Sequence, residues 1–378
     1  MSDSGPTVRR LADWGQARLR ALAADYETPL YVLDVARVRE NAARLQSAFD
    51  QEDISYAVKA NTTTPVLATL SETGLGAEAA SAGEVVRALD AGFAGSDVRY
   101  TAVNPPARDL DLVCDLATDH DLIVTVGATD TLDRLRERGY DGRLCIRANP
   151  GVGAGHHEKV TTGDAPKFGV PLERVADLAA DVAADPDLDL VGLHAHAGSG
   201  ISPGEMDAHR ELVARMGTLT SRVTDRGIDL EFCNVGGGLG VPCRPAEAPL
   251  DLDAVARATR EAFREGITDG GAGDAPDVRL GIEPGRYLVA DTGVLLATVN
   301  TVKETADVTV IGVDAGMTTL VRPAMYDAYH ELRVLAPTAD RDRVRATVAG
   351  PICETAGVRG TRRTSPVGRA SSCPHRRR

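Results

Sequence analysis

The sequence predicts an α/β fold: a parallel (β/α)8 barrel joined to a smaller, mostly antiparallel β domain. Strand-like and helix-like runs alternate over most of the chain, and eight strand-like runs precede Arg286. After Arg286, short β-type runs replace this rhythm. Alternation predicts a parallel sheet, and eight units favour closure into a barrel. A doubly wound open sheet is the alternative, disfavoured because no GxGxxG motif follows the first barrel strand.

The elements follow in chain order. A strand-like run, Pro29–Leu33, precedes the barrel. The eight barrel strands are expected at Ser55–Ala60, Ala77–Ala80, Val98–Val103, Leu122–Val126, Leu144–Ala148, Leu190–His196, Leu230–Val235 and Val278–Ile282. Helical patterns between them include Thr64–Thr73, Ala82–Ala91, Leu172–Ala184 and Pro203–Arg226. Later β-type runs are Leu288–Val289, Val294–Val302, Val308–Val313, Glu331–Leu335 and Val344–Val348, and Gly270–Asp277 is expected to be a polar loop.

These elements predict four regions. Residues 1–34 supply a helix and a strand to the β domain, and residues 35–286 form the barrel. Residues 287–357 continue the β domain, and residues 358–378 form a basic, disordered tail.

The composition narrows the class of protein. The net charge is −13, but the tail carries seven arginines and no acidic residue, so the rest is near −20. Such an acidic surface disfavours nucleic acid and anionic membranes as partners and fits a halophilic-like protein. Six scattered cysteines predict neither a disulfide framework nor a zinc ribbon. Without an apolar leader or membrane-length run, a cytoplasmic protein is expected.

Lys59 is the most informative residue, as one of four lysines against 38 arginines. It ends the first predicted barrel strand, where a charged amine is costly to bury. Such an amine survives best with a lowered pKa or as an imine with a carbonyl. A surface lysine at a strand end is the alternative.

Other polar residues also end barrel strands, where the active sites of such barrels lie. The glycine triplet 236–238, with Ser199 and Gly285, predicts a phosphate cradle because glycine lets backbone amides approach an anion. A tight turn is the alternative. The further strand-end residues are Glu78, Ser81, Arg147, Asn149, His194, His196, Glu283 and Arg286.

His194 and His196 share one strand face and suggest two kinds of site. A metal pair needs ligands on other strands, which the remaining histidines do not supply, so an imidazole stacked on an aromatic cofactor fits better. One of the two can be a structural histidine. The sequence His156-His157-Glu158 lacks the HExxH spacing.

Three further groups of residues offer polar contacts to a ligand. Glu283 can accept an N–H from a ring nitrogen, with a salt bridge to Arg286 or Arg147 as the alternative. Arg322 and Tyr326 suit a substrate carboxylate. Cys353 and Glu354 offer a thiol acid and a carboxylate.

Together these motifs resemble the diaminopimelate decarboxylase family, in the alanine-racemase-like (fold type III) group of pyridoxal-phosphate enzymes. The resemblance runs from Tyr26 to Glu354. Its motifs are YAVKAN (56–61), AASAGE (79–84), HAHAGS (194–199), NVGGG (234–238), EPGR (283–286), VDAGM (313–317), RPAMYDAYH (322–330) and GPICE (350–354). The last two favour the diaminopimelate branch over ornithine, arginine or carboxynorspermidine decarboxylases.

The resemblance implies a role for each matched residue. Lys59 holds the aldehyde of pyridoxal 5'-phosphate as an imine, Glu283 keeps the pyridine nitrogen protonated, and His196 stacks on the ring. Glu78 stands where the family commonly has Asp. The phosphate region is assigned to Ser199, Gly236, Gly237, Gly238, Gly285 and Arg286.

The substrate side is implied in the same way. Arg286 also lies near the substrate, and Arg322 and Tyr326 hold its distal carboxylate. A homodimer partner supplies Cys353 and Glu354, with Cys353 as the general acid.

The implied activity is decarboxylation of meso-2,6-diaminopimelate to L-lysine and CO2, the last step of lysine biosynthesis. A protonated pyridine takes up the electron pair left by CO2, which suits the carboxylate of Glu283. Racemase relatives typically have arginine there. The alternatives are a decarboxylase of another basic amino acid, a cofactor-binding relic without turnover, and a metal-dependent barrel hydrolase.

The resemblance ends after Glu354. About fifty further residues are expected, as several strands of ordinary size would need, including a tyrosine near the phosphate. The chain instead ends in a basic tail, which out-of-frame coding or a genuine tail would explain. An incomplete β domain with lowered stability is therefore expected.

Overall fold

The computed structural model describes residues 7–152, 168–271, 277–304, 308–335, 343–344, 346–352 and 365–366. The chain forms two compact units. The first contains residues 1–7, 34–241 and 248–292, and the second contains residues 8–33, 242–247 and 293–378.

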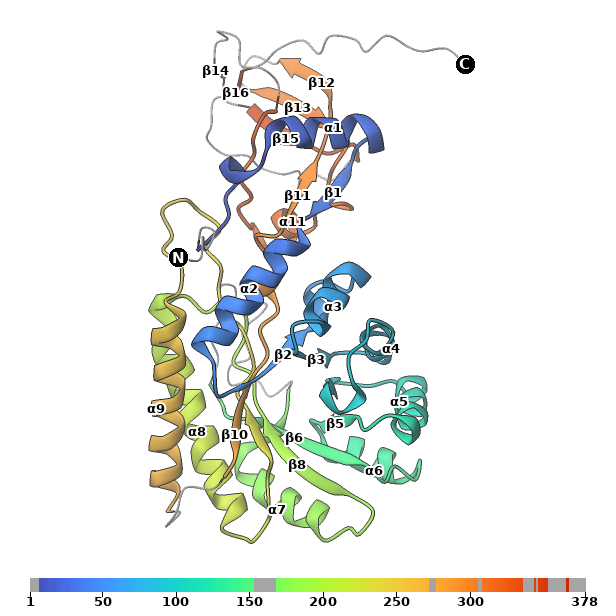
Figure 1. Ribbon diagram of the computed structural model, residues 1–378, viewed down its shortest axis with the longest axis vertical. Coiled ribbons are helices and arrows are strands. Elements are labelled where there is room, and N and C mark those ends of the chain that lie inside the picture. Colours follow the sequence, from blue (N-terminus) through green and yellow to red (C-terminus); the bar gives the residue numbers. More distant parts are fainter. Residues whose placement is uncertain are drawn as a thin grey trace. The chain divides into compact units, whose positions relative to one another are not determined.

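The first unit is a closed barrel of parallel strands (Figure 1). The strand order is β5-β4-β3-β2-β10-β9-β8-β6, and β6 pairs back with β5. All eight predicted strands are therefore confirmed, and the open sheet is excluded. The strands are β2 (Asp53–Ala57), β3 (Gly76–Ala79), β4 (Val98–Tyr100), β5 (Ile123–Val126), β6 (Arg143–Asn149), β8 (Asp189–His194), β9 (Phe232–Asn234) and β10 (Arg279–Ile282).

Helices connect these strands and cover the barrel from outside. The four predicted helices are confirmed to within a few residues. The helices are α2 (Val35–Ala48), α3 (Thr64–Ser71), α4 (Ala82–Asp90), α5 (Ala107–Asp119), α6 (Thr129–Arg136), α7 (Leu172–Ala183), α8 (Met206–Thr224), α9 (Leu252–Gly270) and α10 (Arg286–Val289). Shorter elements are the 3₁₀ turns η2 (Val58–Ala60), η3 (Gly95–Asp97) and η5 (Pro203–Glu205), and strand β7 (Val170–Pro171).

Local sequence explains where several helices begin. Asp34, Ser81 and Asp251 each cap the helix that follows by accepting a backbone N–H in its first turn. The strands are apolar because helices cover one face and the barrel interior the other. In β5, for example, all four residues are buried.

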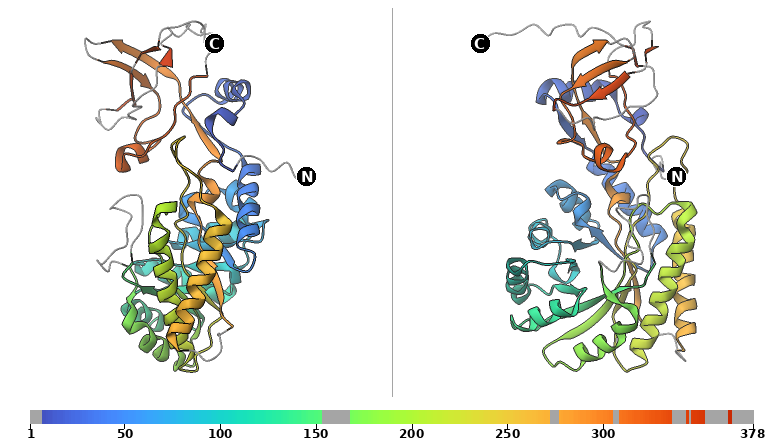
Figure 2. Two further views of the ribbon diagram at one scale, coloured as in Figure 1. Left: turned by 90° about the vertical axis from the view of Figure 1, so that its left-hand side faces the viewer. Right: turned by 180° about the vertical axis from the view of Figure 1, so that it is seen from behind.

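Helices α8 and α9 pack along their lengths, as Figures 1 and 2 show. Two glycines permit this approach. A Cβ on Gly217 would lie 2.4 Å from the carbonyl oxygen of Phe263, and a Cβ on Gly266 would lie 2.0 Å from that of Ala214.

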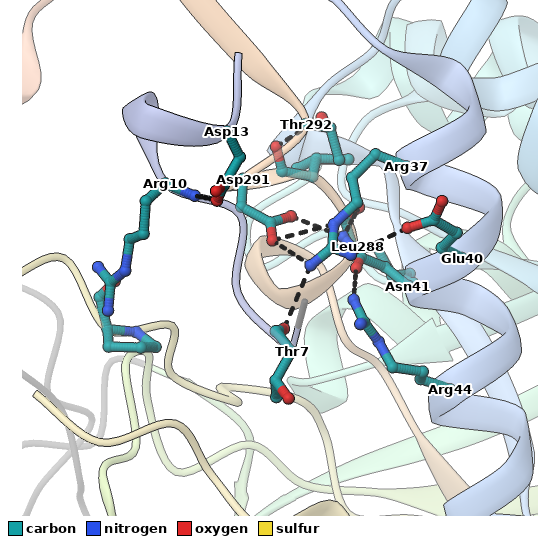
Figure 3. A network of polar contacts seen from close by, with 12 residues as sticks. Thr7, Arg10, Asp13, Arg37, Glu40, Asn41, Arg44, Leu288, Asp291 and Thr292 are labelled. Atoms are coloured by element: carbon teal, nitrogen blue, oxygen red, sulfur yellow. Dashed lines mark hydrogen bonds and ion pairs between the residues drawn. The ribbon is translucent and has the colours of Figure 1, made fainter. Parts of the chain in front are cut away.

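A buried arginine fixes α2 to the end of α10 (Figure 3). Arg37 is 2% exposed and donates through Nε and Nη2 to Oδ2 of Asp291, at 3.1 and 2.7 Å. Asn41, one turn later, donates to Oδ1 of Asp291 and to the carbonyl oxygen of Leu288. The network holds α10, the helix that begins at Arg286.

The described part of the second unit contains three small sheets and a local apolar core (Figure 2). Strands β1 and β11 are antiparallel, and the order β12-β13-β15 joins one antiparallel and one parallel pair. Its core comprises Trp14, Leu19, Val294 and Leu296. The elements are η1 (Leu11–Asp13), α1 (Gln16–Tyr26), β1 (Leu30–Leu33), β11 (Gly293–Leu296), β12 (Val299–Glu304), β13 (Thr309–Val313), α11 (Arg322–Tyr326), β14 (Arg343–Val344), β15 (Ala346–Ala349) and β16 (Ser365–Pro366).

Several predictions for the region after the barrel need correction. Leu288–Val289 is helical within α10, and Glu331–Leu335 has no regular structure. The expected run Val294–Val302 is divided between β11 and β12. Within the region predicted as a tail, Ser365–Pro366 pairs with β14.

Among the helices that the structure describes, none combines the length and apolar content needed to span a bilayer.

Candidate active site

Polar side chains from six strand ends gather at the carboxyl edge of the barrel. Parallel strands in a closed ring all end at the same rim. The register makes neighbours of Glu78 and Ala57, of Arg147 and His194, and of His194 and Asn234. Residues far apart in sequence therefore meet around one opening.

Lys59 lies in η2, directly after β2, and its Nζ forms an ion pair and hydrogen bond with Oε2 of Glu78. The lysine side chain is 52% exposed, whereas that of Glu78 is 2% exposed. The amine is thus accessible while its partner is buried. This agrees with a reactive lysine at the barrel mouth.

The charge states of this pair follow from burial and its neighbours. Burial lowers the pKa of Lys59, but the carboxylates of Glu78 and Glu283 more than offset this, so the pKa is raised. Burial raises the pKa of Glu78 to about 7, although Lys59 opposes the shift.

Glu283 directly follows β10 and is held by His194. Nε2 of His194 lies 2.9 Å from Oε2 of Glu283, and both side chains are buried. Burial alone would raise the pKa of Glu283, but His194 and Lys59 lower it overall, which keeps the carboxylate ionised. The described hydrogen-bond partner of Glu283 is thus His194, which the sequence analysis did not pair with it.

The glycine triplet follows β9 as a turn in which side chains cannot be accommodated. Gly236 and Gly238 have φ of 77° and 91°, and a Cβ on Gly237 would lie 1.9 Å from the carbonyl oxygen of Glu283. The backbone N–H of Gly237 donates to Nδ1 of His196 at 3.3 Å. This contact places the proton of His196 on Nε2, and burial lowers the pKa of this imidazole to about 3.

Ser199 and Arg286 meet beside the same turn. Nη2 of Arg286 donates to Oγ of Ser199 at 3.3 Å, and Gly285 precedes the arginine at the N-terminal cap of α10. Ser81, by contrast, caps α4 by accepting the N–H of Glu84, and Oδ1 of Asn149 accepts the N–H of Gly151. These two predicted strand-end residues have local structural partners.

The remaining predicted site residues belong to the second unit or lie outside the described residues. Arg322 and Tyr326 are at the two ends of α11 in the second unit, where Nη1 of Arg322 lies 3.4 Å from Nε2 of His330. Cys353 and Glu354 lie outside the described residues, as do His156, His157 and Glu158. Among the described residues, no three His, Cys, Asp or Glu side chains cluster as a metal site would require.

Two features of the site had no role assigned from sequence. Asn234 is fully buried, and its Oδ1 accepts the N–H of Gly236 at 2.8 Å, which shapes the glycine turn. Its position two residues before Gly236 was a usable signal, because Asn side chains favour such bonds. The pairing of His194 with Glu283 depends on two strands 89 residues apart and had no local signal.

These residues fit pyridoxal phosphate in three respects. The accessible amine of Lys59 can hold an aldehyde. Within the part of the chain that the structure describes, Oε1 of Glu283 is buried without a hydrogen-bond partner, as an acceptor for a ring N–H would be. The glycine turn and Arg286 suit a phosphate group.

Comparison with known proteins agrees with this geometry. Residues 35–290 match the family model described as pyridoxal-dependent decarboxylase, pyridoxal binding domain. A diaminopimelate decarboxylase from Methanothermobacter thermautotrophicus is 41% identical over 348 residues, which are 90% of this chain and 79% of that protein. One from Escherichia coli K12 is 34% identical over 352 residues, 90% of this chain and 79% of that protein.

A solved structure supports the same assignment. Diaminopimelate decarboxylase from Helicobacter pylori, complexed with L-lysine, superposes with a TM-score of 0.80 at 27% identity, covering 90% of this chain and 82% of that one. The ordered motifs, the closed barrel and these relatives agree, and the chain belongs to the diaminopimelate decarboxylase family of pyridoxal-dependent decarboxylases.

Proposed function

We propose that this protein converts meso-2,6-diaminopimelate to L-lysine and CO2 with pyridoxal 5'-phosphate as cofactor, the last step of lysine biosynthesis. The observation that carries this function is that one barrel mouth holds an exposed lysine, Lys59, together with a buried, ionised carboxylate, Glu283. The relatives at 34–41% identity favour the same reaction.

The bound cofactor supplies an electron sink for the pair of electrons that remains when CO2 leaves. Lys59 holds its aldehyde carbon covalently. Before that bond forms, the ammonium of Lys59 must lose a proton, and Oε2 of Glu78 lies beside it to accept one. A carboxyl pKa of about 7 suits Glu78 to this transfer near neutral pH.

Glu283 would favour a protonated cofactor ring, because an ionised carboxylate beside the ring nitrogen stabilises the proton there. His196 would stack on the ring, and its neutral imidazole would add no positive charge to compete with that proton. Ser199, Gly236, Gly237, Gly238, Gly285 and Arg286 bind the phosphate.

The substrate contacts are carried by the resemblance. Arg286, Arg322, Tyr326 and Glu354 bind the amino acid and its distal carboxylate, for which a guanidinium and a phenol are suited. Cys353 returns a proton to the carbon that loses CO2. We also propose a cytoplasmic location, with which a small, polar amino-acid substrate is consistent.

The direct test is release of lysine and CO2 from meso-diaminopimelate by purified protein with pyridoxal phosphate. We expect both products in equal amounts, and none from a Lys59→Ala variant. Turnover of ornithine or arginine in place of diaminopimelate would assign another basic amino-acid decarboxylase. Cofactor absorbance without turnover of any of them would identify a binding relic.

We further propose a homodimer in which Cys353 and Glu354 act at the partner's active site. Mixing inactive Lys59→Ala with inactive Cys353→Ala subunits should restore up to about a quarter of the activity, since one site in four then has both groups intact if subunits exchange randomly. Mixtures that stay inactive while sedimenting as mixed dimers would exclude shared sites.

A further inference from the structure

His194 and Glu283 form a buried pair in which each residue has one atom left over. Nε2 of His194 and Oε2 of Glu283 are 2.9 Å apart, with 3% and 6% of the side chains exposed. In the described part of the chain, Nδ1 of His194 and Oε1 of Glu283 are buried without hydrogen-bond partners. The pair therefore has one internal bond and one unused carboxylate oxygen.

The surrounding charges decide which residue of the pair carries the proton. Lys59 and Arg147 are the cations that act on His194, and both oppose a further positive charge there. Glu283 is the carboxylate that acts on it, and burial favours the neutral imidazole. With a neutral imidazole, the cations of Lys59 and Arg147 balance the anions of Glu78 and Glu283. A neutral His194 that donates from Nε2 to an ionised Glu283 satisfies all of these groups.

We propose that His194 is a positioning residue for the cofactor ring: it donates Nε2–H to Oε2 of Glu283, holds that carboxylate ionised and reserves Oε1 for the ring nitrogen. This inference rests on the proposed role of Glu283 as partner of the cofactor nitrogen. It gives the first histidine of the HAHAGS motif a task distinct from that of His196. A histidine that only filled space at this position would need no donor nitrogen.

The test compares cofactor affinities rather than turnover. The 1-deaza analogue of pyridoxal phosphate has carbon in place of the ring nitrogen, so it lacks the N–H that Glu283 would accept. The ratio of its dissociation constant to that of pyridoxal phosphate measures the Glu283 contact. The variants are His194→Phe, which removes the donor, and His194→Gln, which keeps an N–H donor.

The chain offers a matched control in His209. This second buried histidine lies in α8, and its Nε2 is 2.8 Å from Oγ1 of Thr259 in α9. His209→Phe makes the same chemical change without touching Glu283. It should leave the affinity ratio at the wild-type value.

Wild type should prefer pyridoxal phosphate, and His194→Phe should reduce that preference about tenfold or more, as expected for a hydrogen bond to a charged group. His194→Gln should recover part of it. An unchanged preference in a folded His194→Phe protein would overturn the proposal while leaving Glu283 in place. If the wild type bound both cofactors equally well, the contact of Glu283 with the ring nitrogen would be excluded, and with it the proposed role of His194.

A second measurement tests whether His194 is a donor from Nε2, even if the His194→Phe protein does not fold. In protein labelled with ¹⁵N-histidine, the signal absent from His194→Gln should report a neutral ring protonated on Nε2 between about pH 6 and pH 8, the range in which an ordinary histidine titrates. A ring protonated on Nδ1 alone, or on both nitrogens, would contradict the donor role.

Discussion

Lys59 and Glu78 pair across the ends of neighbouring strands, with the cation accessible and the anion buried. This asymmetry leaves the side chain of Lys59 open to a ligand and shields the carboxylate of Glu78 from solvent. It also makes Glu78 sensitive to pH, because its charge is stable only while Lys59 is charged and close by.

Replacing Lys59 by alanine should abolish both covalent attachment of the cofactor and activity, by at least about 10³-fold, as for other enzymes that lose a nucleophile. Borohydride reduction followed by peptide mass spectrometry checks the attachment. The control is Lys303→Ala, an exposed lysine on β12, which should retain both properties. Cofactor found on another lysine of the wild type would contradict this prediction.

Glu78 should make the stability of the cofactor-free protein depend on pH. Its pKa rises from an ordinary 4.5 to about 7 on folding, so the folded state binds this proton more tightly than the unfolded state. The contribution to the unfolding free energy is therefore complete below pH 4.5 and falls between pH 4.5 and about pH 7, by up to about 3 kcal/mol. Denaturant titrations of wild type and Glu78→Gln should show this difference.

The control for Glu78→Gln is Glu72→Gln, which removes a carboxylate from an exposed ion pair with Arg39. Its effect should stay within about 0.5 kcal/mol. A constant difference between wild type and Glu78→Gln across the pH range would show that Glu78 does not titrate as proposed.

Gly237→Ala should destabilise the protein by about 1–3 kcal/mol or more and weaken cofactor binding, because its Cβ would lie 1.9 Å from the carbonyl oxygen of Glu283. Gly83→Ala is the matched control. Gly83 lies in α4, and a Cβ added there would have nothing within 4 Å, so alanine should be neutral or stabilising. Equal stabilities of the two variants would argue against a closely packed turn.

Breaking the buried pair of Arg37 and Asp291 should cost about 3–5 kcal/mol for either Arg37→Met or Asp291→Asn, since each removes an ion-pair partner of a buried charge. The double variant should lose less unfolding free energy than the sum of the losses of the two single variants. Denaturation of all four proteins gives the coupling free energy directly, and strictly additive losses would refute the coupling.

The barrel could be predicted from the sequence because each strand is a short apolar run separated from the next by a helical pattern. The secondary structure after Gly285 was harder to predict from the sequence. Tyr287, Leu288 and Val289 look like a strand, but Asn41 binds the carbonyl of Leu288 and the helix is held from outside. Glu331–Leu335 also alternates like a strand, yet Arg333 reaches the carbonyl of Leu11, which no local pattern could reveal.

The candidate site likewise contains residues that local sequence could identify and contacts that it could not. Lys59, Glu78 and Glu283 could be identified because their positions at strand ends are local properties of the sequence. The partner of Glu283 could not, since the choice among His194, Arg147 and Arg286 depends on how β8 and β10 are placed around the ring. Asn234 was overlooked because its bond serves the backbone of the turn rather than a ligand.

The pairing of β2 with β10 has a consequence for how the protein matures. Lys59 and Glu283 follow strands β2 and β10, which become neighbours only when the first and last barrel segments join. A nascent chain that has not yet emerged beyond the last of these strands has no complete coenzyme pocket. Binding of the coenzyme should therefore report closure of the barrel. During refolding, it should begin when β2 and β10 pair.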